Sequence, residues 1–158
     1  MVTLKINDTV VEVEEGLNVI QANHTGKTLS YKISYGGKTI LYMTDNELDR
    51  KLAGSKAAVP ARLDKAIAFV QDADLLIHDA QFTNEEYPPK IGWEHSTWQD
   101  AAWLAMRGQV KRLALFHHDP DRIVSEVDLI VEDCKKELAI QGSDIICYGA
   151  REGLEITL

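Results

Sequence analysis

Apolar and polar residues alternate in short runs over the first third of the chain, and turn residues separate these runs. The alternation predicts five strands, at Thr3–Ile6, Val10–Glu14, Leu17–Ala22, Leu29–Tyr35 and Thr39–Thr44. Gly36 and Gly37 stand between the last two runs, which is typical of a β-hairpin. This part of the chain is therefore predicted to be all β.

After Asp45 the pattern changes to alternating helices and strands. Pro60 precedes a stretch, Ala61–Asp72, whose apolar residues recur at helical spacing, so we predict a helix there. The other predicted elements are a strand at Leu75–Ile77, a helix capped by Ser96 or Thr97 and ending near Gly108, a strand at Lys111–Phe116, a helix at Ile123–Ile140, and strands at Asp144–Tyr148 and Leu154–Leu158.

Strands first and β/α alternation later predict an α/β fold, with a mixed β-sheet and helices packed on one face. We interpret residues 1–158 as a single domain, because no linker, repeat or low-complexity segment divides them. Such a layer leaves one sheet face or edge that needs a partner.

The charge balance limits the classes of partner. The chain has 17 Lys and Arg against 25 Asp and Glu, a net charge of −8. A broad basic face for holding nucleic acid is therefore excluded, because phosphate binding needs clustered Lys and Arg. Nucleic acid stays open only as a substrate, with a local basic site or a partner chain supplying the charge.

Several features indicate the cytoplasm. Residues 1–8 show no basic segment followed by an apolar run, and no stretch reaches the roughly 20 apolar residues that span a bilayer. Cys134 and Cys147 belong to no metal-binding spacing and are interpreted as buried thiols in a reducing compartment. We expect a cytoplasmic protein that does not contact a membrane.

The residues able to carry chemistry stand at or just after the predicted strand ends. They include all the histidines, His24, His78, His95, His117 and His118, together with Asp45 and Asp79. In α/β sheets that edge is where ligands bind. His24, Asp45 and His117 are suitable donors for zinc, iron or manganese. Asp79 and His95 suit a different task, since a histidine oriented by a carboxylate can donate a proton to a departing oxygen.

These residues stand in segments that resemble the later motifs of metallo-β-lactamase-fold hydrolases, closest to the ribonuclease Z and phosphodiesterase-like branch. The segments are Asn23-His24-Thr25-Gly26, Thr44-Asp45-Asn46-Glu47, His78-Asp79-Ala80-Gln81, Gly92-Trp93-Glu94-His95-Ser96-Thr97 and Leu115-Phe116-His117-His118-Asp119-Pro120. Each is weak alone, but their order, intervals and strand placement agree over roughly residues 17 to 125.

The resemblance implies a role for each site residue. His24 would bind a first metal, Asp45 would bridge two metals, and His117 would bind the second, with zinc expected first and iron or manganese as alternatives. His95 would be the proton donor, acting with Asp79. Ribonuclease Z usually has glutamate at the position of Asp79, so an aspartate favours a neighbouring branch over tRNA processing.

One motif of the family is absent from the sequence. The first metal motif, His-x-His-x-Asp-His, has no counterpart, and the sequence contains no His-x-His pair. Each metal would then keep two ligands from this chain, fewer than the three protein donors of a well-held catalytic zinc. The chain corresponds to the C-terminal half of the family's αβ/βα sandwich, so we expect it to form a homodimer or to bind a separate N-terminal half chain.

The first functional hypothesis is a component or fragment of a metal-dependent hydrolase that uses metal-activated water on a phosphodiester or a related ester. Its substrate would be a small molecule or a phosphodiester. The alternative is a non-catalytic binding or assembly module that has lost the first metal motif, and a single-metal or cyclic-nucleotide sensor also remains open. Trp93, Trp98 and Trp103 are expected to pack around the helix after His95, with a place for Trp93 in a substrate wall as the alternative.

Overall fold

The computed structural model describes residues 2–6, 9–13, 16–50 and 58–158. In chain order its strands are β1 (Val2–Ile6), β2 (Thr9–Val13), β3 (Leu17–Gln21), β4 (Leu29–Tyr35), β5 (Lys38–Met43), β6 (Leu75–Asp79), β7 (Arg112–Phe116) and β8 (Ile146–Gly149). Its helices are α1 (Ala58–Val70), α2 (Trp98–Arg107), α3 (Val124–Ile140) and a short 3-10 turn, η2 (Pro88–Lys90). The predicted α/β fold is confirmed, although Glu14, at the end of the second predicted strand, lies outside the described residues.

Local chemistry explains several of these elements. Gly36 and Gly37 have φ of 56° and 73°, which is the left-handed backbone that a tight two-residue hairpin turn between β4 and β5 requires. Thr97 begins α2 as its N-cap, because its side chain accepts a hydrogen bond from the backbone N–H of Asp100 at 3.0 Å. Both features were predicted from the sequence.

The predicted strand at Leu154–Leu158 is wrong. After β8 the chain turns instead, with the N–H of Leu154 donating to the carbonyl of Arg151 at 3.1 Å, and residues 154–158 have no strand partner in the described structure. Alternating apolar residues make a strand only where another strand supplies the ladder of hydrogen bonds. Here β8 is the last strand of its sheet.

Strands β3 to β8 form one six-stranded sheet in the order β3-β4-β5-β6-β7-β8, and β1 and β2 form a separate two-stranded sheet. The first pairs of the large sheet are antiparallel, and the pairs from β5 to β8 are parallel, so the sheet is mixed as expected. Since β3 and β5 both run antiparallel to β4, the strands β3, β5, β6 and β7 all point in the same direction. Their carboxyl ends therefore meet at one edge.

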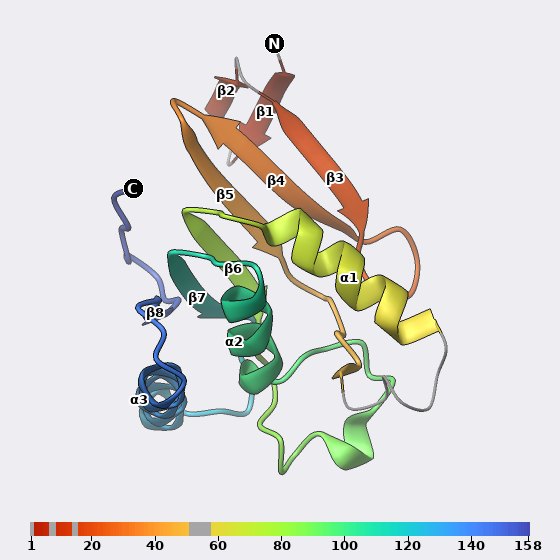
Figure 1. The fold of residues 1–158 in the computed structure, drawn as a ribbon, viewed down its shortest axis with the longest axis vertical. Helices are drawn as coiled ribbons and strands as arrows, with labels where there is room; N and C mark the ends of the chain where they lie inside the picture. The colour runs from red at the N-terminus through yellow and green to blue at the C-terminus, as the bar shows by residue number, and fades with distance from the viewer. Residues whose placement is uncertain (1, 7–8, 14–15, 51–57) are drawn as a thin grey trace.

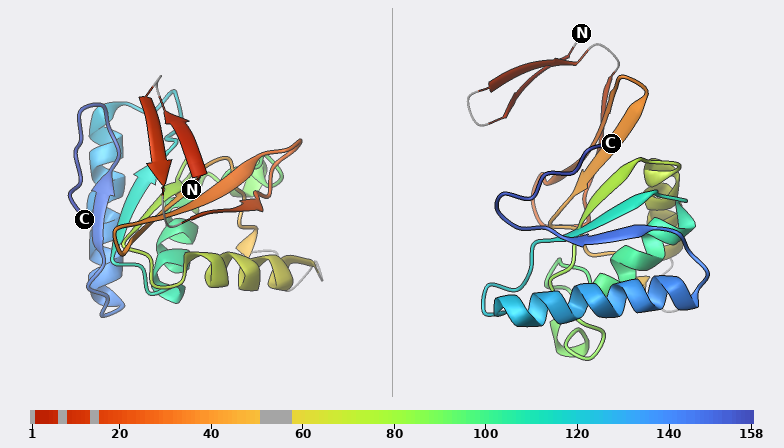
Figure 2. Two further views of the ribbon diagram at one scale, coloured as in Figure 1. Left: turned by 90° about the horizontal axis from the view of Figure 1, so that it is seen from above. Right: turned by 90° about the vertical axis from the view of Figure 1, so that its left-hand side faces the viewer.

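The three long helices lie on one face of this sheet (Figures 1 and 2). Leu41, Leu76, Leu113 and Cys147 point to that face and are buried in one core with residues of all three helices. Burial of these side chains is the main contribution to the stability of this layer.

The opposite face presents a row of side chains that the strand pairing places across all six strands. The row consists of Val19, Tyr31, Tyr42, Ile77, Ala114 and Tyr148. Within it Val19 is 48% exposed and Tyr42 is 37% exposed, Ala114 is buried, and the other three are partly exposed. None of the three long helices covers this face. We call these six residues the open sheet row. Such an apolar surface is typical of a layer that packs against a second one.

Candidate metal centre

Four strand ends bring the predicted site residues together. His24 follows β3, Asp45 follows β5, Asp79 ends β6 and His117 follows β7. Because the carboxyl ends of these strands share one edge of the sheet, residues far apart in sequence become neighbours. The fifth predicted residue, His95, comes from the loop between η2 and α2.

The donor atoms of these residues form two overlapping groups. His24, Asp45 and His95 each offer one nitrogen or carboxylate oxygen atom such that the three atoms lie within 4.8 Å of one another, and so do Asp79, His95 and His117. The groups are connected, since His117 Nε2 lies 3.5 Å from Asp45 Oδ1 and the rings of His95 and His117 stack with centroids 4.8 Å apart. All five predicted site residues are thus brought together.

Two of these residues have a strained backbone. Asp45 has φ of 50° and His117 has φ of 54°, both in the left-handed region that residues with a Cβ rarely adopt. Each such residue costs of the order of 1–3 kcal/mol and persists where the surrounding structure over-determines it, often at functional sites. The conformation ends each strand abruptly and turns its side chain toward the shared edge.

Asp79 and His95 form a directed pair. Asp79 is fully buried, and its Oδ2 accepts a hydrogen bond from His95 Nδ1 at 2.7 Å. Its other oxygen accepts from the backbone N–H of Ser96 at 3.3 Å and of Gln81 at 3.2 Å, which fixes the carboxylate. The hydrogen bond to Asp79 raises the pKa of His95 above its usual value, while burial opposes this shift. Since Nδ1 binds Asp79, Nε2 is the ring nitrogen of His95 that can act on another group.

His78 does not join the cluster, and the expectation that all the histidines gather at one edge is wrong for it. Its ring is fully buried, its Nδ1 donates to the carbonyl of Asp79 at 2.7 Å, and its Nε2 accepts from Asn46 Nδ2 at 3.3 Å. Burial lowers the pKa of His78, which keeps it neutral. Successive residues of a strand point to opposite faces, so His78 faces the helices while Asp79 faces the site.

His118 is also separated from the cluster. It is half-buried and lines a cavity of about 410 Å³ between α3 and the chain that follows β8, together with Val127, Val131 and Tyr148. Burial is the main reason that its pKa is lowered. The sequence left its role open, and the structure places it in packing behind the site.

Glu47 is a residue whose role the sequence reasoning missed. It is buried, and its carboxylate accepts hydrogen bonds from the Tyr87 hydroxyl at 2.5 Å, from the N–H of Gly92 at 2.8 Å and from the N–H of Glu94 at 3.0 Å. Burial and the Glu47 carboxylate raise the pKa of Tyr87 well above its usual range, so it stays a donor. Glu47 therefore fixes the loop that carries His95, and its place two residues after Asp45 was the only signal in the sequence.

His24 has a second carboxylate beside it. Glu94 Oε2 lies 3.3 Å from His24 Nε2 and accepts a hydrogen bond from Thr25 Oγ1 at 2.8 Å. The Nδ1 of His24 lies 3.0 Å from the carbonyl of Thr25 and 3.2 Å from Thr28 Oγ1. These contacts engage Nδ1 with Thr25 and Thr28 and place Nε2 beside Glu94.

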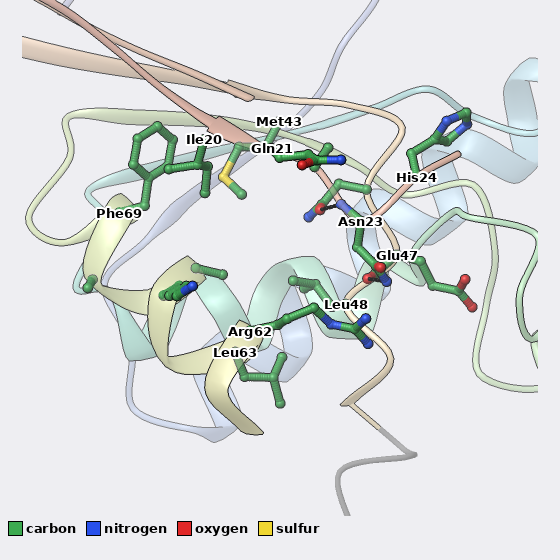
Figure 3. A pocket seen from close by; sticks show the side chains of 15 residues that line it. Ile20, Gln21, Asn23, His24, Met43, Glu47, Leu48, Arg62, Leu63 and Phe69 are labelled. Atoms are coloured by element: carbon green, nitrogen blue, oxygen red, sulfur yellow. Dashed lines mark hydrogen bonds between the residues drawn. The ribbon is translucent and has the colours of Figure 1, made fainter. Parts of the chain in front are cut away.

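A larger cavity, of about 790 Å³, lies on the helix side of the sheet next to α1 (Figure 3). Ile20 and Phe69 lie toward one end of it and Asn23 and Glu47 toward the other, and Arg62 and Leu63 line it from α1. Its lining includes His24 but none of Asp45, Asp79, His95 and His117. This cavity is therefore adjacent to the metal-type cluster and separate from it.

Comparison with known proteins decides the family. Residues 2–118 match the model of the β-lactamase superfamily domain. The chain belongs to this superfamily. Over 121 residues it is 34% identical to ribonuclease Z of Saccharolobus islandicus, which covers 74% of this chain and 39% of that protein. Over 57 residues it is 51% identical to ribonuclease Z of Sulfurisphaera tokodaii, covering 36% of this chain and 19% of that protein.

Solved structures of this superfamily share the fold. The metallo-β-lactamase-fold protein YhfI of Bacillus subtilis matches with a TM-score of 0.59 and 18% identity, over 87% of this chain and 47% of that one. The short form of human tRNase Z matches with a TM-score of 0.52 and 17% identity, over 89% of this chain and 42% of that one. The predicted half-sandwich fold is confirmed, and the chain spans less than half the length of these relatives.

The length and composition of a helix decide whether it can span a membrane. No helix within residues 58–158, where the described helices lie, is long and apolar enough to cross a bilayer.

Proposed function

We propose that this chain is part of a metal-dependent hydrolase that acts on a phosphodiester or a related ester. The observation that carries the proposal is the clustering of His24, Asp45, His95 and His117 donor atoms at one edge of the sheet, with His117 Nε2 only 3.5 Å from Asp45 Oδ1. Neutral imidazole and carboxylate are the ligands that zinc, iron and manganese prefer, and zinc fits this donor set best.

The spacing suits a shared ion. Donors about 2.1 Å from a tetrahedral zinc lie about 3.4 Å from each other. The measured separation of His117 Nε2 and Asp45 Oδ1 agrees with that value. In the proposal His24 and Asp45 would hold one metal, and Asp45 and His117 would hold a second, so that Asp45 would serve both. When bound, such ions make a water nucleophilic at neutral pH and stabilise the negative charge that develops on the substrate.

Asp79 and His95 have a different task in the proposal. Asp79 holds His95 Nδ1 at 2.7 Å, which fixes the ring and leaves Nε2 to hold a proton. From that nitrogen the proton passes to the departing oxygen of the ester. The pair is therefore proposed as the proton-transfer residues and not as the main metal ligands.

The site needs ligands from outside this chain. His24 with Asp45 and His117 with Asp45 supply two protein donors for each metal, where a catalytic zinc usually has three. We propose that a complementary half of the fold, from a separate chain or from more of the same polypeptide, packs on the open sheet row and supplies them. Its apolar composition and exposure suit a second layer.

The proposed substrate is a phosphodiester of RNA or of a smaller nucleotide. The curated relatives that match are named ribonuclease Z, and the chain is similar to them although it has aspartate at position 79. The net charge of −8 does not suit a broad nucleic-acid surface, so the substrate contacts in this proposal are local to the site.

Metal content of purified variants tests the assignment. We expect His117→Ala and Asp45→Asn each to weaken the affinity for zinc at least about tenfold. Loss of a residue that only orients a ligand already costs that much. His95→Ala is expected to keep most of the metal while removing hydrolysis of a phosphodiester by the completed enzyme. His118→Ala is the matched control, because it removes the neighbouring histidine that lies outside the cluster.

The result can contradict the proposal in two ways. Equal loss of metal in His95→Ala and His117→Ala would contradict the assignment of His117 as a metal ligand and His95 as the proton donor. Absence of divalent-metal binding by the chain, both alone and with a complementary half, would favour a binding or assembly module instead.

A further inference from the structure

One large aromatic side chain beside the cluster is not packed as expected. Trp98 is 8% exposed and belongs to the core, but Trp93 is 61% exposed. The expectation that Trp93 packs around the helix after His95 is therefore wrong, and its alternative, a place in a substrate wall, stays open. An exposed indole two residues before His95 calls for a physical reason, because burial of so large an apolar surface is strongly favourable.

The backbone of the loop around Trp93 is held by hydrogen bonds to a buried carboxylate. Gly92 has φ of 86° and Glu94 has φ of 74°, so the residues on both sides of Trp93 are in the left-handed region. The backbone N–H groups of the same two residues donate to the buried carboxylate of Glu47 at 2.8 Å and 3.0 Å. For Glu94, which has a Cβ, this conformation is strained and is held by those contacts. The loop thus fixes the indole in an exposed position.

A cation lies next to the indole. Lys90 Nζ is 5.9 Å from the centroid of the Trp93 ring and 4.2 Å from that of Phe82. The Phe82 ring in turn lies 6.2 Å from the His95 ring, so Lys90 and the site share this aromatic neighbour. The amine and the exposed indole are therefore neighbours, and the buried Phe82 ring lies between the amine and the proposed proton donor.

Of the carboxylates near Lys90, two are engaged with other residues and one contacts the lysine. Glu94 is directed to Thr25 and His24, on the side of β3. Glu86 is paired with Arg122 at 2.8 Å. Asp119 Oδ2 accepts a hydrogen bond from Lys90 Nζ at 3.3 Å, and this is the contact that an incoming phosphate would replace or share.

We propose that Trp93 and Lys90 form a nucleotide subsite, in which the indole stacks on the base next to the scissile phosphodiester and the lysine binds a neighbouring phosphate. The proposal deepens the proposed function and rests on it for the place of the scissile bond. Stacking on an exposed aromatic accepts any base, because every base has a π-face, and one nearby cation supplies a phosphate contact despite the acidic net charge.

The test is an NMR titration of the metal-free chain with adenosine 5′-monophosphate. The sequence has three tryptophans, so three indole N–H signals are expected, and Trp93→Phe identifies that of Trp93. We expect the nucleotide to shift the Trp93 signal in a saturable way. Ribose 5-phosphate, which has no base, should bind at least about tenfold more weakly. Trp93→Ala should weaken nucleotide binding about tenfold, while Trp93→Phe should keep most of it because a ring remains.

The lysine has its own arm in the experiment. Lys90→Met should weaken binding of adenosine 5′-monophosphate and leave the weaker binding of adenosine, which has no phosphate, unchanged. Matched controls are Tyr35→Ala, whose side chain is also 61% exposed but stands in the β4–β5 hairpin, and Lys136→Met on α3. Both should bind like the unmodified chain, and far-UV circular dichroism should be unchanged in every variant.

Two results would overturn the subsite. One is the absence of any nucleotide-dependent shift at Trp93. The other is equal affinity for ribose 5-phosphate and the nucleotide, which would reduce the site to phosphate binding. Because no metal is present in this titration, its result can be interpreted even if the chain fails to bind metal in the separate metal-binding experiment. Nucleotide binding by a chain that binds no metal would support the subsite and contradict the proposed hydrolase function.

Discussion

At the scale of single residues, the site depends on backbone conformations that the chain would not adopt alone. Asp45, Glu94 and His117 all have positive φ without being glycine. Each lies where a strand or loop must turn a side chain toward the cluster. Asp45, His117 and the Asp79–His95 pair were found from the sequence by their residue types and positions. The left-handed backbone of Asp45 and His117 was not predicted, because aspartate and histidine enter that region more often than most residues with a Cβ but still uncommonly.

A different single residue, Gly108, is required for space. Its φ is ordinary, yet a Cβ added there would lie 2.3 Å from Val70 Cγ2, and Val70 is fully buried at the end of α1. We therefore expect Gly108→Ala to lower the free energy of unfolding by about 1–3 kcal/mol through overpacking. Urea titration followed by circular dichroism measures this change.

The control for that substitution is Gly142→Ala. Gly142 has open space around it but φ of 69°, so its cost is conformational and is expected to be about 1 kcal/mol. If Gly108→Ala proved no more destabilising than Gly142→Ala, the close approach of α1 and the end of α2 would not constrain this position.

At the scale of elements, Asp74 ties three strands together where they begin. Its side chain is 6% exposed. Its carboxylate accepts a hydrogen bond from the N–H of Thr39 at 2.8 Å and from Lys111 Nζ at 2.9 Å. Thr39 belongs to β5, Asp74 immediately precedes β6, and Lys111 immediately precedes β7. These contacts hold the ends opposite the site in register, and so support the spacing of the strand ends that carry it.

This arrangement predicts a dependence of stability on pH. The hydrogen bond to Lys111 is the main cause that lowers the pKa of Asp74 below 3.8, followed by the bond from Thr39, and burial opposes both. A lowered pKa means that the stabilisation is present above the unfolded value and is lost as pH falls through the folded value. We expect Asp74→Asn to lower the free energy of unfolding by about 1.5 kcal/mol at pH 7.

The same measurement over pH checks the cause. The difference between Asp74→Asn and the unmodified chain should shrink as the pH of urea titrations is lowered from about 5 toward 2. Asp133→Asn, which removes an exposed carboxylate paired with Lys136, should change stability by less than about 0.5 kcal/mol. A difference for Asp74→Asn that stayed constant down to pH 2 would mean that the charge of Asp74 is not responsible.

At the scale of the whole molecule, the open sheet row is the surface of the sheet that the three long helices leave uncovered. The helices cover one face of the sheet, and the row of Val19, Tyr31, Tyr42, Ile77, Ala114 and Tyr148 crosses the other. The superfamily relatives are more than twice as long as the matched part of this chain. A second layer on this row would bury the apolar surface and bring further ligands toward the strand ends.

We accordingly predict that the chain by itself associates through the open sheet row. Light scattering should give a mass above that of one chain, and Tyr42→Lys should shift the mass toward the monomer. The residue is 37% exposed, so the substitution does not disturb the helix-side core. A control, Leu129→Lys on the exposed side of α3, should leave the mass unchanged. A compact monomer for the unmodified chain would contradict the prediction.

The sequence alone determined the elements and the chemistry available. Hydrophobic periodicity and turn residues such as Gly36-Gly37 and Thr97 fix local structure through short-range contacts, so most strands and helices were predictable within a few residues. The motifs around His24, Asp45, Asp79, His95 and His117 also indicated the family and the candidate site, since their residue types, order and intervals are properties of the chain itself.

Only the tertiary structure decided which side chains meet. Leu154–Leu158 alternates like a strand but has no neighbour to pair with in the described structure. His78 and Asp79 are adjacent in sequence, yet they face opposite sides of β6 and only Asp79 reaches the cluster. Glu47 and the exposed Trp93 acquire their places from contacts that join the segment after β5 to the loop before α2. Such contacts join residues some 45 positions apart, and they form only when the sheet sets its strand order, which no local pattern encodes.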